Sequence, residues 1–435
     1  IIGIIMKFLL TLMAVLAISQ ISLAVRYNVT CFYDTFSIQR GGNANFTLVD
    51  LKKSFKYCNN VIYGYVGFNA DTFDIKTLHP LQKSQFEQVK KLKTEYRHIK
   101  FLLSLGGDKD LDKPDKYIKL LEASDIKQEK FIKSAKKFLK KYKFDGLDLS
   151  YQFSRNKTKS KSVVKSLLKT GKIIAKAVIN KKPTNLLGKT KSSKKSHTLN
   201  KHQFTVLVNK LKNSLKHERL LLSLTVLPHV NVTESLNIPS IMNDLDFVIL
   251  STIDYSTPYL TPKEADFLSP IPKPRNQSHN SYIEKDVNYW LTQNFPRKKL
   301  YIAVAAYGRT WRMDKALKSS EMPIHSSLNG PANGGEWTHI PGLLSRPEIC
   351  MKLPKMTRKQ NKNYGSYAYR AADVKDRSGM FLTYDDEENV AVKDDYVFQK
   401  TLAGIALFDL SLDDLHGKCN KGLFPILKAT RLYDY

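Results

Sequence analysis

Eight short runs of apolar residues, separated by longer lysine-rich stretches, constrain the fold of this 435-residue chain more than any other feature. The runs lie at 29–34, 61–68, 99–107, 144–151, 220–228, 246–255, 300–308 and 402–410. In the intervening stretches 80–96 and 127–142, apolar residues recur every three or four positions, which predicts amphipathic helices. Strands of this kind alternating with helices favour a covered parallel sheet. Eight such units predict an α/β fold, the (β/α)8 or TIM barrel.

The segment 309–395 departs from this alternation and is rich in glycine, proline and tyrosine. We interpret it as a small α+β insertion domain between the seventh and eighth strands. The barrel itself is then expected to comprise residues 25–308 and 396–435.

The first 24 residues have the features of a secretory signal peptide. Met6 and Lys7 are followed by the apolar run 8–18 and by the small residues Ser22 and Ala24. The apolar run is too short to span a bilayer, so no membrane insertion is expected. Residues 1–5 precede the expected initiator Met6 and are interpreted as leader sequence. The chain is therefore predicted to be secreted and extracellular.

Four cysteines in a secreted chain indicate two disulfides. Three pairings are open to them, and the pairing of Cys31 with Cys58 and of Cys350 with Cys419 closes the shorter loops. No CxxC motif or neighbouring histidine pair supports a metal site, and no cofactor is expected. The sequence also contains five N-glycosylation sequons, at Asn28, Asn45, Asn156, Asn231 and Asn276.

The chain is strongly basic, with a formal net charge of +30. Between Asp148 and Glu218 there are 18 Lys and Arg and no acidic residue. We interpret 154–201 as a basic loop insertion in the barrel, which predicts either a solvated surface or a binding site for polyanions such as sulfated polysaccharide or nucleic acid. The candidate polyanion-binding residues are Arg155, Lys157, Lys159, Lys161, Lys189, Lys191, Lys194 and Lys195.

The fourth apolar run carries the clearest candidate site. Side chains alternate across a strand, so Asp148, Ser150 and Gln152 are expected to face one side near the barrel mouth, where the active sites of such barrels lie. A general acid at this place needs a group that can release a proton. Gln152 has the size of glutamate but a carboxamide cannot serve as that acid.

The segment DGLDLSYQ at 145–152 resembles the signature of the family-18 chitinases, whose corresponding acidic positions are Asp, Asp and Glu. The resemblance covers the whole predicted mature chain through CFYD (31–34), SLGG (104–107), TID (252–254), AAYGRTW (306–312) and ALFDLSLDDLHGKC (406–419). The replacement of Glu by Gln, the enlarged loop after the fourth strand and ALFDL resemble more closely the insect imaginal disc growth factors. That group is chitinase-like and catalytically silent.

The resemblance implies a degenerate catalytic site at Asp145, Asp148, Ser150, Gln152 and Asp254. Gln152 stands where the family has its proton-donating Glu, and Ser150 where it has the Asp that orients the substrate. No residue is therefore expected to be catalytic.

The same comparison implies weakened sugar binding. Ile253 replaces a tyrosine that grips the N-acetyl group, Asp108 a sugar-stacking tryptophan, and Phe408 the tryptophan floor of the last strand. The residues that could still contact a ligand are Tyr33, Asp108, Gln152, Ile253, Asp254, Tyr307, Trp311 and Phe408, although packing is favoured over ligand contact for Tyr307 and Trp311.

Three functions are consistent with these features. The first is a secreted, non-enzymatic, growth-factor-like glycoprotein that recognises a cell-surface receptor or glycan. The second is polyanion binding through residues 155–201, and the third is a chitin lectin or residual chitinase.

Overall fold

A computed structural model of the chain describes residues 27–107, 109–110, 112–113, 115–150, 194–228, 230–275, 280–314, 322, 328–372 and 379–431. The predicted signal peptide therefore lies outside the described residues. So does the basic loop up to Lys191, while Lys194 and Lys195 begin a helix whose side chains are described only from residue 200 onward.

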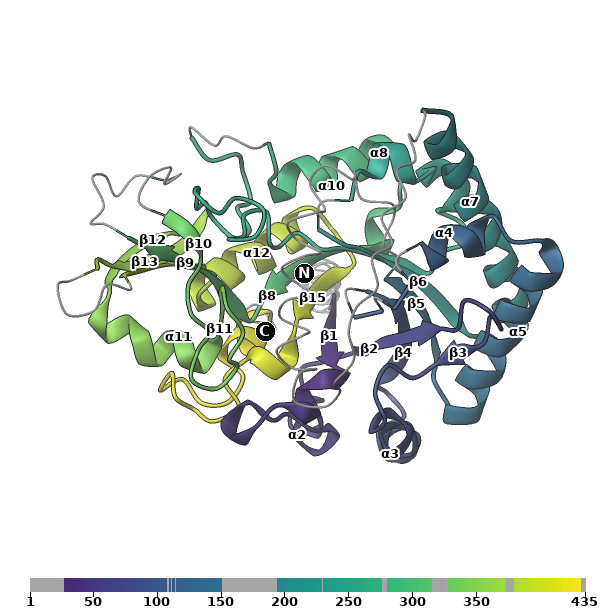
Figure 1. Cartoon of the computed structure of the whole chain (residues 1–435), viewed down its shortest axis with the longest axis horizontal. Helices are drawn as coiled ribbons and strands as arrows, with labels where there is room; N and C mark the ends of the chain where they lie inside the picture. The colour runs from purple at the N-terminus through teal and green to yellow at the C-terminus, as the bar shows by residue number, and fades with distance from the viewer. Residues whose placement is uncertain are drawn as a thin grey trace, which may run out of the picture.

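The predicted barrel is present (Figure 1). Its eight strands are β1 (Asn28–Asp34), β2 (Asn60–Phe68), β4 (Lys100–Gly106), β5 (Gly146–Ser150), β6 (Leu221–Val226), β7 (Phe247–Leu250), β8 (Leu300–Ala305) and β15 (Gly404–Phe408). They pair in parallel in the order β1-β15-β8-β7-β6-β5-β4-β2, and pairing of β1 with β2 closes the ring. The short strand β3 (Ile75–Lys76) adds to β2 in antiparallel orientation.

Helices cover the outside of the barrel. They are α2 (Leu48–Lys52), α3 (Gln82–Glu95), α4 (Lys116–Leu121), α5 (Asp125–Tyr142), α7 (Lys194–Lys216), α8 (Val232–Ser235), α9 (Ile238–Ile241), α10 (Ile283–Thr292), α12 (Glu387–Gln399) and α13 (Pro425–Ala429). The two helices expected from periodicity, at 80–96 and 127–142, correspond to α3 and α5.

Helix α5 shows why these segments are helical. Its buried positions Gln128, Phe131, Ile132, Ala135 and Leu139 follow the three-and-four spacing of one helix face. An aspartate lies in the first turn and two lysines lie in the last, which complements the helix dipole. The helix ends where the next residue adopts a left-handed conformation with φ of 58°.

The barrel separates two apolar layers, because successive side chains of a strand face opposite sides. On β2, Ile62 faces the lumen, whereas Val61 and Tyr63 face the layer between strands and helices. The lumen is filled mainly by apolar side chains from all sides, including Phe32, Leu102 and Ile249.

A second, antiparallel sheet is inserted between β8 and β15 in the sequence. It consists of β9 (Tyr307–Met313), β10 (Leu328–Pro331), β11 (Leu343–Ser345), β12 (Thr357–Asn361), β13 (Gly365–Arg370) and β14 (Gly379–Tyr384), and helix α11 (Arg346–Lys352) follows β11. The strand order is β10-β9-β14-β13-β12, with β11 beside β9. Figure 1 shows this sheet on the side of the molecule opposite α5 and α7. The insertion boundaries 309–395 remain a prediction.

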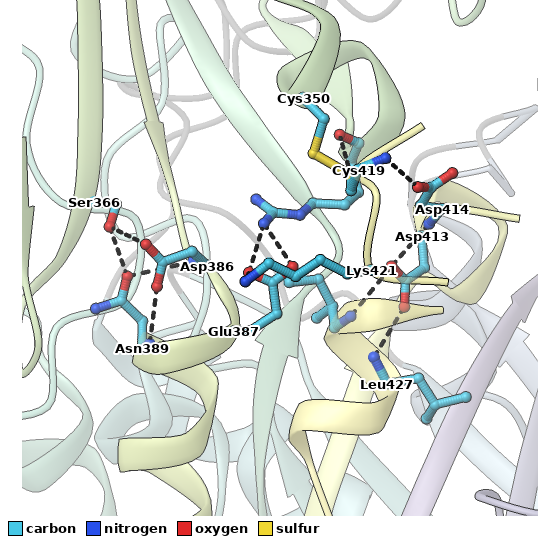
Figure 2. Close-up of polar contacts among 12 residues, drawn as sticks. Cys350, Ser366, Asp386, Glu387, Asn389, Asp413, Asp414, Cys419, Lys421 and Leu427 are labelled. Carbon is cyan, nitrogen blue, oxygen red and sulfur yellow. Dashed lines mark hydrogen bonds and ion pairs between the residues drawn. A yellow bond between two sulfur atoms is a disulfide. The ribbon is translucent and has the colours of Figure 1, made fainter. Parts of the chain in front are cut away.

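Both predicted disulfides are present, Cys31–Cys58 and Cys350–Cys419. The second joins α11 to the segment after β15, next to a group of ion pairs (Figure 2). There Glu387, at the start of α12, accepts two hydrogen bonds of 2.8 Å from Arg346 and lies 3.8 Å from Lys421. The second sheet is thus fastened to the carboxyl-terminal part of the barrel both covalently and electrostatically.

Among the helices of the described chain, none is both long and apolar enough to cross a membrane.

Candidate functional site at the barrel mouth

The two strands that flank β5, β4 and β6, place hydroxyl groups around the carboxylate of Asp148. The residue lies in the middle of β5, is fully buried, and pairs in register with Ser104 of β4 and Ser223 of β6. Ser104 donates to it at 2.7 Å, Ser223 at 2.8 Å and Thr225 at 2.9 Å. Burial raises the pKa of Asp148, and the three hydroxyl donors oppose that rise. The carboxylate is therefore held by neutral donors and has no described acidic neighbour with which to share a proton.

Ser150 occupies the next inward position, two residues along β5. It is 1% exposed, and its hydroxyl has no hydrogen-bond partner in the described structure. This hydroxyl cannot carry the charge that a carboxylate would place beside Asp148. Gln152, two residues further along the sequence, lies outside the described residues, as does Asp108.

Asp145 does not join this site. It precedes β5, at the amino end of the strand, and its carboxylate accepts a 2.7 Å hydrogen bond from the backbone of Phe101. It also pairs with Lys93 of α3 at 2.6 Å. The prediction that groups Asp145 with Asp148 is therefore wrong in space, because Asp145 contacts α3 before the strand begins, whereas Asp148 is enclosed by hydroxyls in the middle of the strand. Asp145 ties a helix to the barrel.

Asp254 forms a closed cluster with two residues of β9. Its carboxylate accepts hydrogen bonds from the Tyr307 hydroxyl at 2.8 Å and from Arg309 at 2.7 and 2.5 Å. The side chains of Arg309 and Asp254 are only 17% and 13% exposed. Burial, with the Asp254 charge adding to it, raises the pKa of Tyr307 well above its usual value. Asp254 is thus already neutralised by an arginine that sequence reasoning did not single out.

Two of the three positions at which the resemblance implied lost sugar contacts, Phe408 and Ile253, are packed within the lumen. Phe408 stacks on Phe32 with ring centroids 4.7 Å apart, and it is 8% exposed. Ile253 is 3% exposed and belongs to the same apolar cluster, together with Tyr65. Neither Phe408 nor Ile253 presents a broad free face to the mouth.

Two predicted ligand contacts lie elsewhere. Tyr33 faces away from the lumen, in the layer between strands and helices, where its hydroxyl accepts a 3.0 Å hydrogen bond from Gln85. Trp311 is fully buried in the core of the second sheet near Phe381, and its indole donates to the carbonyl of Thr261 at 2.9 Å. For Tyr33 the prediction of ligand contact is wrong, and Trp311 serves packing, the interpretation favoured for it from the sequence.

The sequence contained signals for the residues that were missed. Ser104, Ser223 and Thr225 are isolated hydroxyl residues in otherwise apolar strands, a pattern that indicates a buried acceptor. Arg309 comes directly after the apolar run 300–308 of the sequence, and a buried arginine requires a carboxylate partner.

Comparison with known proteins places this geometry in a family. The model of the glycosyl hydrolases family 18 matches residues 28–413. The chain belongs to glycosyl hydrolase family 18. Within it, the chitinase-like protein Idgf3 of Drosophila simulans is 38% identical over 445 residues, covering 96% of each chain. Imaginal disk growth factor 6 of Drosophila melanogaster is 35% identical over 431 residues, covering 93% of this chain and 92% of that protein.

Solved structures of family-18 proteins share the fold. The Group IV chitinase of Ostrinia furnacalis superposes with a TM-score of 0.75 at 22% identity, covering 93% of this chain and 98% of that one. Human YKL-39, described as a pseudo-chitinase with retained chitooligosaccharide binding properties, superposes with a TM-score of 0.73 at 21% identity, covering 93% and 99%. Such low identity supports the shared barrel and not a shared activity.

The sequons differ in their surroundings. Asn28 and Asn231 are exposed, whereas Asn45 is half-buried and donates to the carbonyls of Ile38 and Arg40 at 2.7 and 3.2 Å. Asn156 and Asn276 lie outside the described residues. Glycosylation of these five sites remains a prediction. Over the described residues, no three His, Cys, Asp or Glu side chains are grouped so that they could hold a metal ion.

Proposed function

We propose that this family-18 protein is secreted and non-enzymatic, and that it acts as a growth-factor-like recognition protein for a cell-surface receptor or glycan. The observation that carries the proposal is the series Asp148, Ser150 and Gln152 at alternate positions of the sequence, of which the first two are buried in β5. The first is enclosed by hydroxyls, the second is a buried serine, and the third is a carboxamide. The names of the Idgf relatives agree with such a role, and the signal-like amino terminus and two disulfides favour secretion.

The expected absence of hydrolysis follows from the lack of a proton donor. Protonation of the leaving sugar oxygen by a general acid contributes roughly 10²–10⁴-fold to the rate. The N–H protons of a carboxamide are not acidic enough for general acid catalysis, and Ser150 supplies no carboxylate to raise the pKa of an acid beside it. In addition, both carboxylate oxygens of Asp254 accept hydrogen bonds from Arg309.

The lumen packing argues against the chitin-lectin alternative. Pyranose rings stack on broad aromatic faces, but Phe408 stacks on Phe32 instead, and an aliphatic side chain occupies position 253. We therefore propose that any recognition of chito-oligosaccharides is weaker than in relatives that keep those aromatic residues.

Hydrolysis of a fluorogenic chitotrioside tests the proposal. The purified protein and its Gln152→Ala variant should both release product at the rate of a protein-free blank. Faster release by the unaltered protein would refute the non-enzymatic assignment. Ser150→Asp combined with Gln152→Glu should recover little activity, because Ile253 and Phe408 remain unsuited to hold the substrate. Robust turnover by that double variant would show that the pocket is intact.

A further inference from the structure

Helix α5 presents a row of lysines to solvent on the face opposite its buried residues. Lys130, Lys133, Lys137 and Lys141 follow one another at spacings of three or four residues, and Lys140 lies beside them. All five are exposed. We call these five residues the lysine face. At 1.5 Å per residue the row from Lys130 to Lys141 is about 16 Å long.

Few carboxylates neutralise the lysine face. Lys133 pairs with Glu129 at 2.8 Å and Lys140 with Glu218 at 3.0 Å, in both cases between largely exposed side chains. Such exposed pairs contribute little and do not remove the local positive potential. For Lys130, Lys137 and Lys141, no carboxylate of the described chain lies within ion-pair distance.

The neighbouring helix α7 provides the contrast. Its Lys210 donates to Asp125 at 2.6 Å, and its Lys212 reaches Asp246 at 2.7 Å. Lysines on that helix are therefore used in contacts that hold the barrel together. Of the lysine face, Lys140 makes such a long-range contact, with Glu218, whereas Lys133 pairs only within α5. Like charges four residues apart, as in Lys133, Lys137 and Lys141, destabilise a helix by about 0.2–0.5 kcal/mol per pair, so folding alone does not favour this arrangement.

The surface beside the lysine face is concave. Lys130, Lys133 and Lys137 line a shallow hollow of about 440 Å³ together with Ser134, Ile126, Glu129 and Asp74. A straight row of cations along the edge of a hollow fits a narrow, linear polyanion better than it fits a flat membrane surface. The apolar face of α5 is buried against the barrel, so the helix cannot insert into lipid.

From this arrangement we infer that the lysine face is a binding surface for a linear sulfated polysaccharide. Nucleic acid is disfavoured because the lysine face has no arginine for bidentate phosphate contacts. In addition, the aromatic residues Phe138 and Tyr142 of α5 are half-buried and so are not free to stack on bases. The choice of a polysaccharide also rests on the proposed secretion. The five residues of the lysine face belong to α5 and are not among the residues assigned to the barrel mouth or to the predicted basic loop 154–201.

The test compares two variants of equal charge in the full-length protein. The first replaces Lys130, Lys133, Lys137 and Lys141 with glutamine. The control replaces four exposed lysines on or near the second sheet, on the opposite side of the molecule, with glutamine: Lys355, Lys359, Lys362 and Lys418. Both lose four positive charges, so net charge alone cannot distinguish them. Thermal unfolding of both variants checks that each is folded.

Binding to immobilised heparin is measured between 0.1 and 0.5 M salt, on the order of physiological ionic strength and above. Loss of four contacts should reduce the slope of log K against log salt by about 3 and weaken binding at 0.15 M salt by roughly 10²-fold. The control should keep both the slope and the affinity of the unaltered protein. De-N-sulfated heparin should bind more weakly than heparin.

Three results would overturn the inference. The first is an equal weakening of heparin binding in the two variants. The second is unchanged heparin binding by the lysine-face variant, and this result would move the site to the loop at 154–201. The third is tighter binding to single-stranded oligo-dT or to phosphatidylserine vesicles than to heparin. None of these measurements depends on chitinase activity, so the inference and the non-enzymatic assignment can fail separately.

Discussion

Replacing Lys116 with methionine would isolate a carboxylate in the interior next to the barrel mouth. Lys116, the first residue of α4, has a fully buried side chain. Its ammonium group donates to the Phe68 carbonyl at 3.1 Å, to Asp112 at 2.7 Å and to Asp110, whose carboxylate is equally buried. These contacts fasten the segment after β4 to the end of β2. After the change, the described structure leaves Asp110 only the Tyr117 hydroxyl, at 2.6 Å.

The size of the effect follows from this geometry. Removing one partner of a buried ion pair destabilises a protein by about 3–5 kcal/mol, because the other charge stays buried without compensation. Methionine retains most of the aliphatic packing of lysine, so the cavity contribution is small. We expect Lys116→Met to lower the free energy of unfolding by about 4 kcal/mol at pH 7. Combining it with Asp110→Asn removes the isolated charge and should recover most of that loss.

The pH dependence gives a second signature. Burial raises the pKa of Asp110 even with Lys116 present. Without the lysine that pKa rises further above its value in the unfolded chain, so the folded state binds a proton that the unfolded state releases. The loss in free energy of unfolding that Lys116→Met causes should therefore become smaller as the pH falls from 7 toward 5.

Urea unfolding followed by tryptophan fluorescence measures both effects, with midpoints compared at a common slope. A loss below about 1 kcal/mol in Lys116→Met would refute the reasoning, since surface changes reach only about half that size. A double variant no more stable than the single variant would refute it equally.

Two further predictions concern the carboxyl-terminal part of the chain. Burial raises the pKa of Asp413 and of Asp409 to about 6, so the free energy of unfolding should fall as the pH rises from about 4 to 6. Asp413→Asn should make this fall less steep. The part of the pH dependence that comes from Asp409 should remain. An unchanged slope in urea titrations across this pH range would contradict the assignment. Replacing Cys350 and Cys419 with serine opens a loop of 69 residues and should cost about 4 kcal/mol by the chain-entropy relation; an unaltered urea midpoint under non-reducing conditions would argue against it.

The barrel could be predicted from the sequence because its strands are buried on both faces. Each of the eight apolar runs corresponds to a strand, since parallel strands covered by helices require near-continuous apolar sequence. The disulfide pairing was also predicted correctly, from the shorter loops. These features depend on composition and spacing within short segments.

The site was predicted only in part, because its geometry depends on where strands begin and end. Asp145 and Asp148 are three residues apart in one motif, but β5 begins between them, so one carboxylate faces α3 and the other faces the lumen. Tyr307 and Trp311 share a strand, yet four residues extend it by about 13 Å, from the mouth into the second sheet. No local pattern marks such a transition.

The partners of Asp148 and Asp254 come from segments far apart in the sequence. Ser223 lies 75 residues beyond Asp148, and Arg309 lies 55 residues beyond Asp254. A single sequence indicates that a buried acid needs donors, but the register of neighbouring strands decides which donors it receives.

For the secreted protein proposed above, the link between Cys350 and Cys419 has a consequence when extracellular proteases cut the chain. A single cut in the exposed strand β12, or anywhere else between these cysteines, would leave both fragments joined by the sulfur bridge. Cleaved molecules would then run as intact ones on electrophoresis until a reductant is added. An extracellular pool of this protein could therefore contain nicked copies that still present the same outer surfaces.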